Sequence, residues 1–424
     1  MDGKVFYAFL EERHISEMSL SLKFDAIARE EHVFMKSISE ISEINTFSIN
    51  IRVDFREGEY KSIRNLESNR WYKITLSKNA KHYAELISGD SLTVETVSVK
   101  SIKVLKRKDE TVFLNTYSFN RLEQSDIYEI SKVINSKCQS PFAIRVINVG
   151  QGNAISATNI TGWDLFDIFY IDIGGGVGNN IDKNIKPQFN PEPGAFVILT
   201  HWDQDHWISA KRYGVLNELT WIVPNQSPLG ISHMKIASRL HQINKLLIWP
   251  DTVKMLNTDI LDIHKLPKSK DRNNSGLVVV SKNENNIHSC NFGCFNQSSE
   301  NKKNTLITGD AKYSKCGFIS RYEIDALIIP HHGGKSSARN LPKSNGSGVA
   351  VLSCGLKNSY GHPDRNTIDR HRNNGWKITN VYYEDLLLLS EDFSCLDNFD
   401  ANCELHIHMI FMKLFWIYRL EFLN

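Results

Sequence analysis

The chain has 424 residues, a length that favours two domains over one. Hydrophobic residues make up 41% and charged residues 23%, a mix that excludes a disordered or fibrous chain. Fifty Lys and Arg oppose 48 Asp and Glu, so the net charge of +2 excludes a global basic field, and nucleic-acid binding needs a local patch.

Cysteine usage and the two ends of the chain bear on its location. Seven Cys, an odd number, do not form a disulfide framework. The start MDGKVFYAFLEERH has no apolar run typical of a secretory signal, so we expect a cytoplasmic protein. The apolar C-terminal tail, residues 401–424, is interrupted by Lys413, Arg419 and Glu421, which argues against a membrane span. We expect this tail to dock on the core as a strand or helix, with a partner- or membrane-binding tail as the alternative.

The first part of the chain, residues 1–138, reads as a β-rich accessory module followed by a connector. Short apolar runs separated by turns predict strands at 47–55, 71–77, 91–105 and 111–117, in a small barrel-like arrangement. Helical spacing of apolar residues predicts a connecting helix within 121–140. No cluster of residues in this module carries recognisable chemistry.

From residue 139 to about 400 the pattern changes to buried strands that alternate with helices. Alternation over this length predicts a layered α/β domain. Helices are expected around 206–218, 233–248, 317–323 and 364–374, and polar residues directly follow the strands. The predicted strands are FAIRVINV, DIFYIDI, AFVILT, WIVP, GLVVVS, TLITG, DALIIP, VAVLS and KITNVYY.

The segment THWDQDHWIS carries the strongest chemical signal in the chain. After the strand AFVILT it supplies an H-x-D-x-D-H pattern made by His201, Asp203, Asp205 and His206. Alternate residues of an extended loop point the same way, so this segment can serve two adjacent metal positions. A plain loop with ordinary helix caps is the competing interpretation.

Two more segments repeat the form of a strand followed by ligand-type residues. Asp310 ends the strand of TLITGDAKYS, and His331 and His332 follow the strand of DALIIPHHGGKSS. Each is weak alone, because a TGD is usually a turn and an HH pair is uninformative. All three in this order are far more specific.

These motifs, in this order, resemble the metallo-β-lactamase superfamily, and in particular the nuclease domain of ComEC-type DNA-uptake proteins. The resemblance covers about residues 141–385 and is carried by INVGQGNA, YIDIGGG, THWDQDH, NNSGLVVV with LITGDA, IIPHHGGKSS and SCGLKNSYGHPDRNTIDRH. It implies an α/β fold, the αββα metallo-β-lactamase sandwich, joined here to an N-terminal β-rich module.

The chain departs from the family pattern at several places. Asn148 and Asn153 replace the two acids of D-V-G-Q-G-D-A, which lowers the local negative charge. Trp207-Ile208-Ser209 stands in place of a Gly pair, and Gly333-Gly334 in place of Gly-Ser. The metal-facing residues are intact, so activity is expected.

The resemblance implies one or two divalent ions. Asp203 places an oxygen donor where the superfamily has His, which favours Mn²⁺ or Mg²⁺ without excluding Zn²⁺. Asp203 and His201 either hold a second ion or act as general base and orienting residue. The expected metal ligands are His201, Asp203, Asp205, His206, Asp310 and His331, with His332 as the alternative member of the tandem pair.

Further residues are expected around the ions. Asp172 is expected to orient a ligand His, and Gln151, Asn153 and His332 to support the ligands from behind. His362 either protonates a leaving oxygen or serves only as a loop residue. The expected catalytic residues are Asp203, Asp205 and His362, and the expected substrate-binding residues are Lys335, Ser336, Asn358 and Tyr360.

The function expected from the resemblance is a metal-dependent phosphodiesterase, most simply a nuclease acting on DNA through activated water. The alternatives are a hydrolase of a small ester, lactone, thioester or cyclic nucleotide, and a non-catalytic assembly component. A bacterial defence or mobile-element setting is expected, with protein partners bound through residues 1–138 or the tail. The basic runs 103–108 and 265–272 are weak candidates for a nucleic-acid patch, and His288, Cys290 and Cys294 form an incomplete zinc-knuckle pattern.

Overall fold

A computed structural model describes most of the chain, and residues 1–388 form one compact unit. The apolar tail, Ser336 and the incomplete zinc-knuckle pattern lie outside the described residues. Among the described residues, no helix has the length and apolar character that a bilayer crossing requires. The described residues are 2–15, 19–32, 38–55, 63–78, 80, 82–89, 93–137, 142–161, 164–177, 180–269, 271–283, 303–335, 339–344, 346–356, 358, 360–382 and 384–388.

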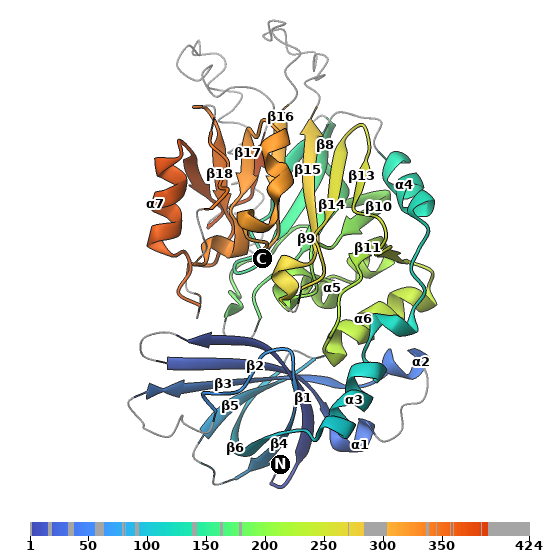
Figure 1. Cartoon of the computed structure of the whole chain (residues 1–424), viewed down its shortest axis with the longest axis vertical. Helices are drawn as coiled ribbons and strands as arrows, with labels where there is room; N and C mark the ends of the chain where they lie inside the picture. The colour runs from blue at the N-terminus through green and yellow to red at the C-terminus, as the bar shows by residue number, and fades with distance from the viewer. Residues whose placement is uncertain are drawn as a thin grey trace, which may run out of the picture. The chain divides into compact units, whose positions relative to one another are not determined.

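The N-terminal part folds as a closed, six-stranded antiparallel barrel, drawn in blue in Figure 1. Its strand order is β1-β2-β3-β5-β6-β4, and strands β1 and β4 pair to close it. Alternate residues of each strand fill the interior, among them Leu10, Leu22 and Phe24, so the expected barrel-like module is confirmed. The strands are β1 (Val5–Ile15), β2 (Ser19–Ala28), β3 (Thr46–Asp54), β4 (Trp71–Ser77), β5 (His82–Ser88) and β6 (Val94–Val104).

The strand predicted at 111–117 is wrong, because this segment belongs to helix α3 (Arg107–Thr116) and its C-cap. Phe113 and Tyr117 lie four residues apart, on one face of the helical turn, and both rings pack on Trp71. Burial of this pair outweighs the β-propensity of the Thr, Val and Phe side chains. Short helices α1 (Arg29–His32) and α2 (Ile38–Ile41) also lie near the barrel strands in sequence, and the expected connector contains η3 (Phe119–Arg121) and α4 (Ile127–Asn135).

Beyond the connector, the chain forms two seven-stranded mixed sheets. The first has the order β12-β11-β10-β9-β8-β7-β20, in which β9 to β12 are parallel. The second has the order β13-β14-β15-β16-β17-β18-β19, in which β16 to β19 are parallel. The strands are β7 (Ala143–Val146), β8 (Ala154–Thr161), β9 (Asp164–Ile173), β10 (Pro191–Ile198), β11 (Thr220–Pro224), β12 (Leu246–Trp249), β13 (Met255–Asn257), β14 (Leu261–Lys265), β15 (Leu277–Asn283), β16 (Lys303–Ile307), β17 (Ala326–Ile328), β18 (Val349–Leu352), β19 (Lys377–Asn380) and β20 (Leu386–Leu388).

Few helices accompany these sheets. The helix expected at 233–248 ends at Gln242, because the apolar run Leu246–Trp249 instead pairs with β11 as β12. The segment expected to be helical at 317–323 forms a 3-10 helix. The helices are η5 (Gln204–His206), α5 (Ser209–Arg212), η6 (Gly214–Glu218), α6 (Ile231–Gln242), η7 (Arg272–Asn274), η8 (Tyr313–Lys315), η9 (Gly317–Arg321), η10 (Pro330–Gly333) and α7 (Arg365–Asn373).

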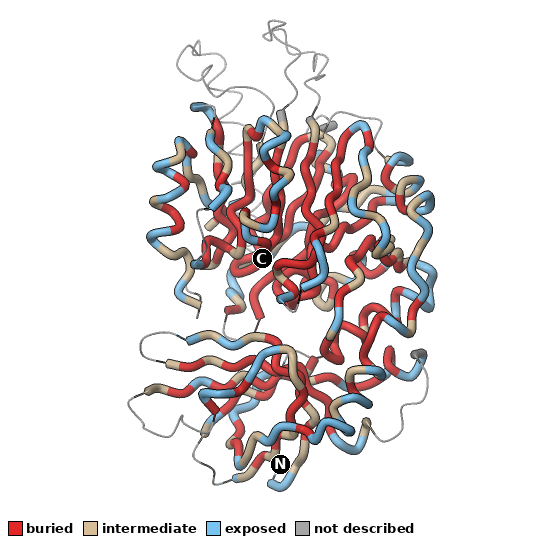
Figure 2. The backbone as a smooth tube through the Cα atoms, in the orientation of Figure 1, coloured by how far each residue is buried: buried red, intermediate tan, exposed pale blue. Residues whose placement is uncertain are grey.

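The two sheets face each other across a shared apolar core, which appears red in Figure 2. Phe169 and Ile198 of the first sheet and Val279 and Ile307 of the second belong to one buried cluster. Another cluster joins the outer face of the first sheet to α6, and a third joins the outer face of the second sheet to α7. The strands therefore lie between helical layers, as expected for a layered α/β domain.

The barrel packs on the sheets through buried contacts. Phe9 and Trp71 of the barrel belong to the same apolar cluster as Trp202 and Ile231. At the N-terminus of α6, the Asp25 carboxylate accepts hydrogen bonds from the backbone N–H and the hydroxyl of Ser232, both at 2.7 Å. The barrel and the sheets thus share part of one core.

Candidate metal centre

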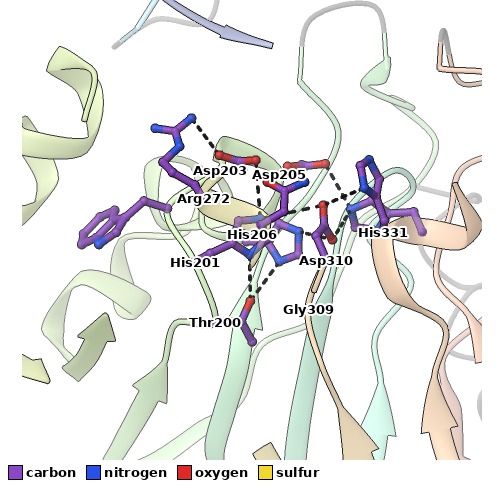
Figure 3. A network of polar contacts seen from close by, with 12 residues as sticks. Thr200, His201, Asp203, Asp205, His206, Arg272, Gly309, Asp310 and His331 are labelled. Carbon is purple, nitrogen blue, oxygen red and sulfur yellow. Dashed lines mark hydrogen bonds and ion pairs between the residues drawn. The ribbon is translucent and has the colours of Figure 1, made fainter. Parts of the chain in front are cut away.

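The candidate site lies where parallel strands of both sheets end. Asp172 is the penultimate residue of β9. The H-x-D-x-D-H loop follows β10, Asp310 follows β16, and the tandem His pair follows β17. Because carboxyl ends of parallel strands meet at one edge of a sheet, residues distant in sequence converge there. Figure 3 shows His206, Asp205 and Asp310 lying close together at this edge.

Close backbone packing holds the H-x-D-x-D-H loop in place. The carbonyl of Asp205 accepts hydrogen bonds from the backbone N–H of Asn153 and of Gly175, both at 3.2 Å. A Cβ at Gly174 would lie 1.8 Å from that carbonyl oxygen, so only glycine fits. The Gly-rich segment therefore supports the loop.

Asp172 connects the first sheet to two histidines of the loop. Its backbone has a φ of 58°, a left-handed conformation that is uncommon for a residue with a side chain. Its buried carboxylate accepts from the backbone N–H and hydroxyl of Thr200, each at 2.7 Å, and from His206 Nδ1 at 2.6 Å. The structure thus places Asp172 behind His206, where we expected an orienting residue.

Hydrogen bonds at Nδ1 fix the tautomer of three imidazoles. His206 donates to Asp172, and His332 donates to the carbonyl of Ser353 at 3.0 Å. The Thr200 hydroxyl gives its proton to Asp172 and accepts from His201 Nδ1 at 3.1 Å. When neutral, each ring therefore presents the lone pair of Nε2 on its other side.

These lone pairs converge on carboxylate oxygens. His206 Nε2 lies 3.0 Å from Asp310 Oδ1, and His201 Nε2 lies 3.8 Å from Asp310 Oδ2. His332 Nε2 lies 3.2 Å from Asp205 Oδ2 and 3.6 Å from Asp310 Oδ1. The three Nε2 atoms and Asp310 Oδ1 are buried and have no hydrogen-bond partner of acceptable geometry. Acceptors that face one another in this way need a proton or a metal ion between them.

The ligand-type atoms form two groups that share His206. His201, His206 and Asp310 make one, and Asp205, His206 and His332 make the other, each with its atoms within 4.8 Å of one another. Nitrogen and carboxylate oxygen donors suit Zn²⁺ or Mn²⁺, and the residues present fit one or two divalent ions.

Of the tandem pair, His332 and not His331 lies in these groups. Both residues have left-handed backbones, with φ values of 53° and 52°, and Gly333 continues the turn at 76°. This turn buries His332 and leaves the side chain of His331 43% exposed, with Nδ1 3.9 Å from Asp310 Oδ2. His331, which we expected among the ligands, lies outside both groups, and His332, the alternative member of the tandem pair, lies in one of them.

Asp203 has a partner that the sequence did not reveal. Its Oδ1 lies 2.8 Å from Nη2 of the buried Arg272, which stands in η7, and its Oδ2 lies 3.5 Å from His201 Nε2. Burial raises the pKa of Asp203, but Arg272 and His201 outweigh burial and lower it below the usual value. The charge of Asp203 is therefore already partly balanced, which favours a supporting role over that of a principal ligand.

The charges of the cluster favour a cation between His206 and Asp310. Burial alone would lower the pKa of His206, but Asp310 and Asp172 outweigh it and raise this pKa well above its usual value. Burial raises the pKa of Asp310, yet His206, His331 and His332 hold it well below the usual value. A proton and a divalent ion thus compete for the same position, so metal binding releases protons.

The two Asn departures take different roles. The Asn148 side chain accepts from Gly150 N at 3.1 Å and donates to Tyr382 O at 3.2 Å, so it holds its own loop. Asn153 is fully buried beside the Asp205 carbonyl, and neither side-chain polar atom has a protein partner. Gln151 accepts from Gly355 N at 3.3 Å. These residues support the loops around the cluster.

The expected substrate-binding residues are divided between loop contacts and the surface. The Asn358 amide donates to the carbonyls of Gly355 and His362, and its oxygen accepts from His362 N, so this side chain shapes its own loop. Burial raises the pKa of the Tyr360 hydroxyl well above its usual value, and Glu12 of the barrel adds to this rise through its charge and a side-chain hydrogen bond. Lys335 is exposed.

His362 lies near the partly exposed His331, on what we call the open side of the cluster. Its ring centre is 5.4 Å from that of His331, at an interplanar angle of 88°. Burial, with His331 and His332 nearby, lowers the pKa of His362 to about 3, so the ring is neutral at pH 7. A Cβ at Gly334 would lie 2.6 Å from His362 Cε1, which accounts for the second Gly after the tandem pair.

A second buried group of acids and histidine lies where the barrel meets α6. Glu11, Asp25 and His233 place ligand-type atoms within 4.8 Å of one another. However, His233 Nδ1 accepts from Gly230 N at 3.1 Å, so the ring proton is on Nε2, 3.0 Å from Glu11 Oε1. This arrangement is a histidine–carboxylate pair, and its proton stands where a metal would need a lone pair.

No protein-family model matches the chain, and no curated protein matches it in sequence. The function is therefore inferred from the chemistry of the site itself. Thr200, Arg272 and Ser353 could not be identified from the sequence pattern, although Thr200 stands directly before His201 as a hydroxyl residue.

Proposed function

We propose that the chain is a metal-dependent phosphodiesterase of the metallo-β-lactamase fold, acting on DNA through activated water. The observation that carries this proposal is the convergence of three tautomer-fixed imidazoles on Asp310 and Asp205, with their Nε2 lone pairs unpaired in the protein. The expected ligands His201, Asp205, His206 and Asp310, joined by His332, would hold one or two divalent ions.

The layered architecture supports the fold in this proposal. Two mixed sheets face each other, helices cover their outer faces, and the His and Asp residues gather where the parallel strands end. The H-x-D-x-D-H segment, Asp310 and the tandem His enter the site in the order that the family resemblance implies. We further propose that residues 1–138 and 139–400 are two domains that pack on each other. Protein partners in a defence or mobile-element system would bind the first domain or the tail.

When bound, a divalent ion supplies activated water near neutral pH and offsets charge on phosphate oxygens. The protein's own residues orient the ligands and the substrate. Asp172 and Thr200 hold His206 and His201 in the tautomer that the ion needs. His362, neutral and close to the open side of the cluster, donates a hydrogen bond to the leaving oxygen, and Lys335 attracts phosphate.

Burial of the ligands bears on the substrate. Asp203 and Asp205 are only 9% and 8% exposed, and Asp310 is 5% exposed. A small or flexible phosphodiester approaches buried ligands more easily than a rigid duplex does. A single strand or a strand end is therefore the favoured form of DNA, and a cyclic nucleotide is the second candidate substrate.

The test is metal content measured together with cleavage of labelled single- and double-stranded DNA in Mn²⁺, Zn²⁺ and Mg²⁺. Asp310→Asn should lose bound metal and cleavage, by at least about 10²-fold in rate. Asp262→Asn is the matched control, because Asp262 is a buried acid of the same sheet that pairs with Lys282 at 2.7 Å, outside the site. Metal bound without cleavage of any DNA, RNA or cyclic nucleotide would refute the phosphodiesterase. Absence of metal in the wild type under all three ions would refute the metal centre.

A further inference from the structure

A β-bulge in barrel strand β1 changes which face of the barrel the last residues of the strand occupy. The pairing of β1 with β2 shifts between Leu10 and Glu12, so Glu11 is the extra residue. Before the bulge, Leu10 pairs with Phe24 inside the barrel; after it, Glu12 pairs with Lys23 on the outer face. Bulges re-aim side chains in this way, and here the change directs Glu12 out of the barrel.

Glu12 and Lys23 form a partly buried ion pair within electrostatic range of the metal ligands. Lys23 Nζ lies 2.6 Å from Glu12 Oε1, and the side chains are 8% and 25% exposed. Burial raises the pKa of Glu12, Lys23 opposes that rise, and the charges of Asp205 and Asp203 add to it. Barrel charges and metal ligands therefore lie within electrostatic range of each other.

Tyr360 connects this pair to His362. Its hydroxyl donates to Glu12, and its ring stacks on His362 with centroids 5.7 Å apart and planes at 23°. His362 in turn packs against the backbone of Gly334 and lies 5.4 Å from the His331 ring centre. The chain of contacts thus runs from the barrel to the open side of the metal centre.

The His14 side chain is on the same face of β1 as that of Glu12. The two residues are on one face of β1, since side chains two apart in a strand share a face. Burial and the nearby His331 lower the pKa of His14. His14 in turn contributes to the lowered pKa of His362. A second barrel residue is thus near the same loop.

The ion pair is not needed simply to hold the barrel against the sheets. The barrel already shares an apolar cluster with the sheets through Phe9, Trp71 and Trp202. Such ion pairs contribute little net stability compared with apolar residues of similar size. Glu12 is also the acceptor that fixes the hydroxyl of Tyr360.

We propose that Glu12 and Tyr360 are positioning residues of the hydrolase: Glu12, held by Lys23, anchors Tyr360, and the Tyr360 ring holds His362 over the metal centre. The barrel is then part of the active site. This inference rests on the proposed function, in which His362 contacts the leaving oxygen.

The kinetic test compares two leaving groups. In Tyr360→Phe and Glu12→Gln, kcat should fall about tenfold on a thymidine dinucleotide, whose alkoxide leaving group needs His362. On a p-nitrophenyl ester of thymidine 5′-phosphate, which needs no such help, kcat should change by less than about twofold. Adding either change to His362→Ala should give no further loss on the dinucleotide. Equal losses on both substrates would show a general structural effect and overturn the proposal.

The second measurement does not depend on activity. Amide hydrogen exchange of a peptide covering residues 358–364 should be faster in Tyr360→Phe and Glu12→Gln than in the wild type. Tyr322→Phe is the matched control, because its hydroxyl donates to Asp262 at 2.9 Å, outside the site. If the wild type cleaves neither substrate, the phosphodiesterase proposal is wrong. The exchange measurement still tests whether Glu12 and Tyr360 position His362. Unchanged exchange in both variants would overturn the positioning.

Discussion

Asp172 offers the sharpest test of how the metal centre is built. Its carboxylate accepts three short hydrogen bonds, from the Thr200 N–H and hydroxyl at 2.7 Å and from His206 Nδ1 at 2.6 Å. In Asp172→Asn, the side-chain NH2 group must face either the backbone N–H of Thr200, which meets Oδ1 in the wild type, or the Thr200 hydroxyl and His206 Nδ1, which both meet Oδ2. A lost hydrogen bond to a charged group is worth about 1.5–3 kcal/mol. Since 1.4 kcal/mol is a factor of ten, metal affinity should fall about 10- to 100-fold.

Competition with a fluorescent chelator measures this affinity, and thermal unfolding of the metal-free protein checks the fold. Asp167→Asn is the control, because Asp167 is an equally buried acid of the same strand β9. It pairs with Arg145 at 2.7 Å and accepts from Tyr170 at 2.6 Å, outside the metal groups. This control should lose stability and keep metal affinity. A folded Asp172→Asn protein that binds metal within about twofold of the wild type would refute the tautomer argument.

Three further predictions concern stability and reactivity. Burial raises the pKa of Asp25 to about 6 from 3.8, so its contribution to stability is present below pH 3.8 and is lost as pH rises through 6. Urea titrations should show a smaller fall in the free energy of unfolding over that pH window in Asp25→Asn than in the wild type. Burial raises the pKa of the Cys316 thiol to about 12, so iodoacetamide at pH 8 should label it only after denaturation, and rapid labelling of the folded protein would contradict this. Gly174→Ala should destabilise the fold by about 1–3 kcal/mol and weaken metal binding, because the new Cβ would lie 1.8 Å from the Asp205 carbonyl; Gly317→Ala, with open space at its Cβ, should do neither.

Much of the site could be predicted from the sequence because its residues follow strands. His201, Asp205 and His206 stand in one short segment, and Asp310 directly follows a strong strand pattern. The helix at 107–116 could not be predicted from the sequence, because its stabilising contact is between Phe113 and Trp71, which are 42 positions apart in the chain. Local propensity is a weak guide when such burial decides the element.

The sequence by itself determined the alternation of strands and helices, the barrel-like first module and the set of metal-type side chains. Only the tertiary structure decided which member of the tandem pair enters the cluster, because that depends on a left-handed turn over His331 and His332. It also decided that Arg272 balances Asp203 and that Glu12 reaches Tyr360. These are contacts between segments far apart in the chain, and sequence pattern carries local periodicity, whereas packing selects which distant groups meet.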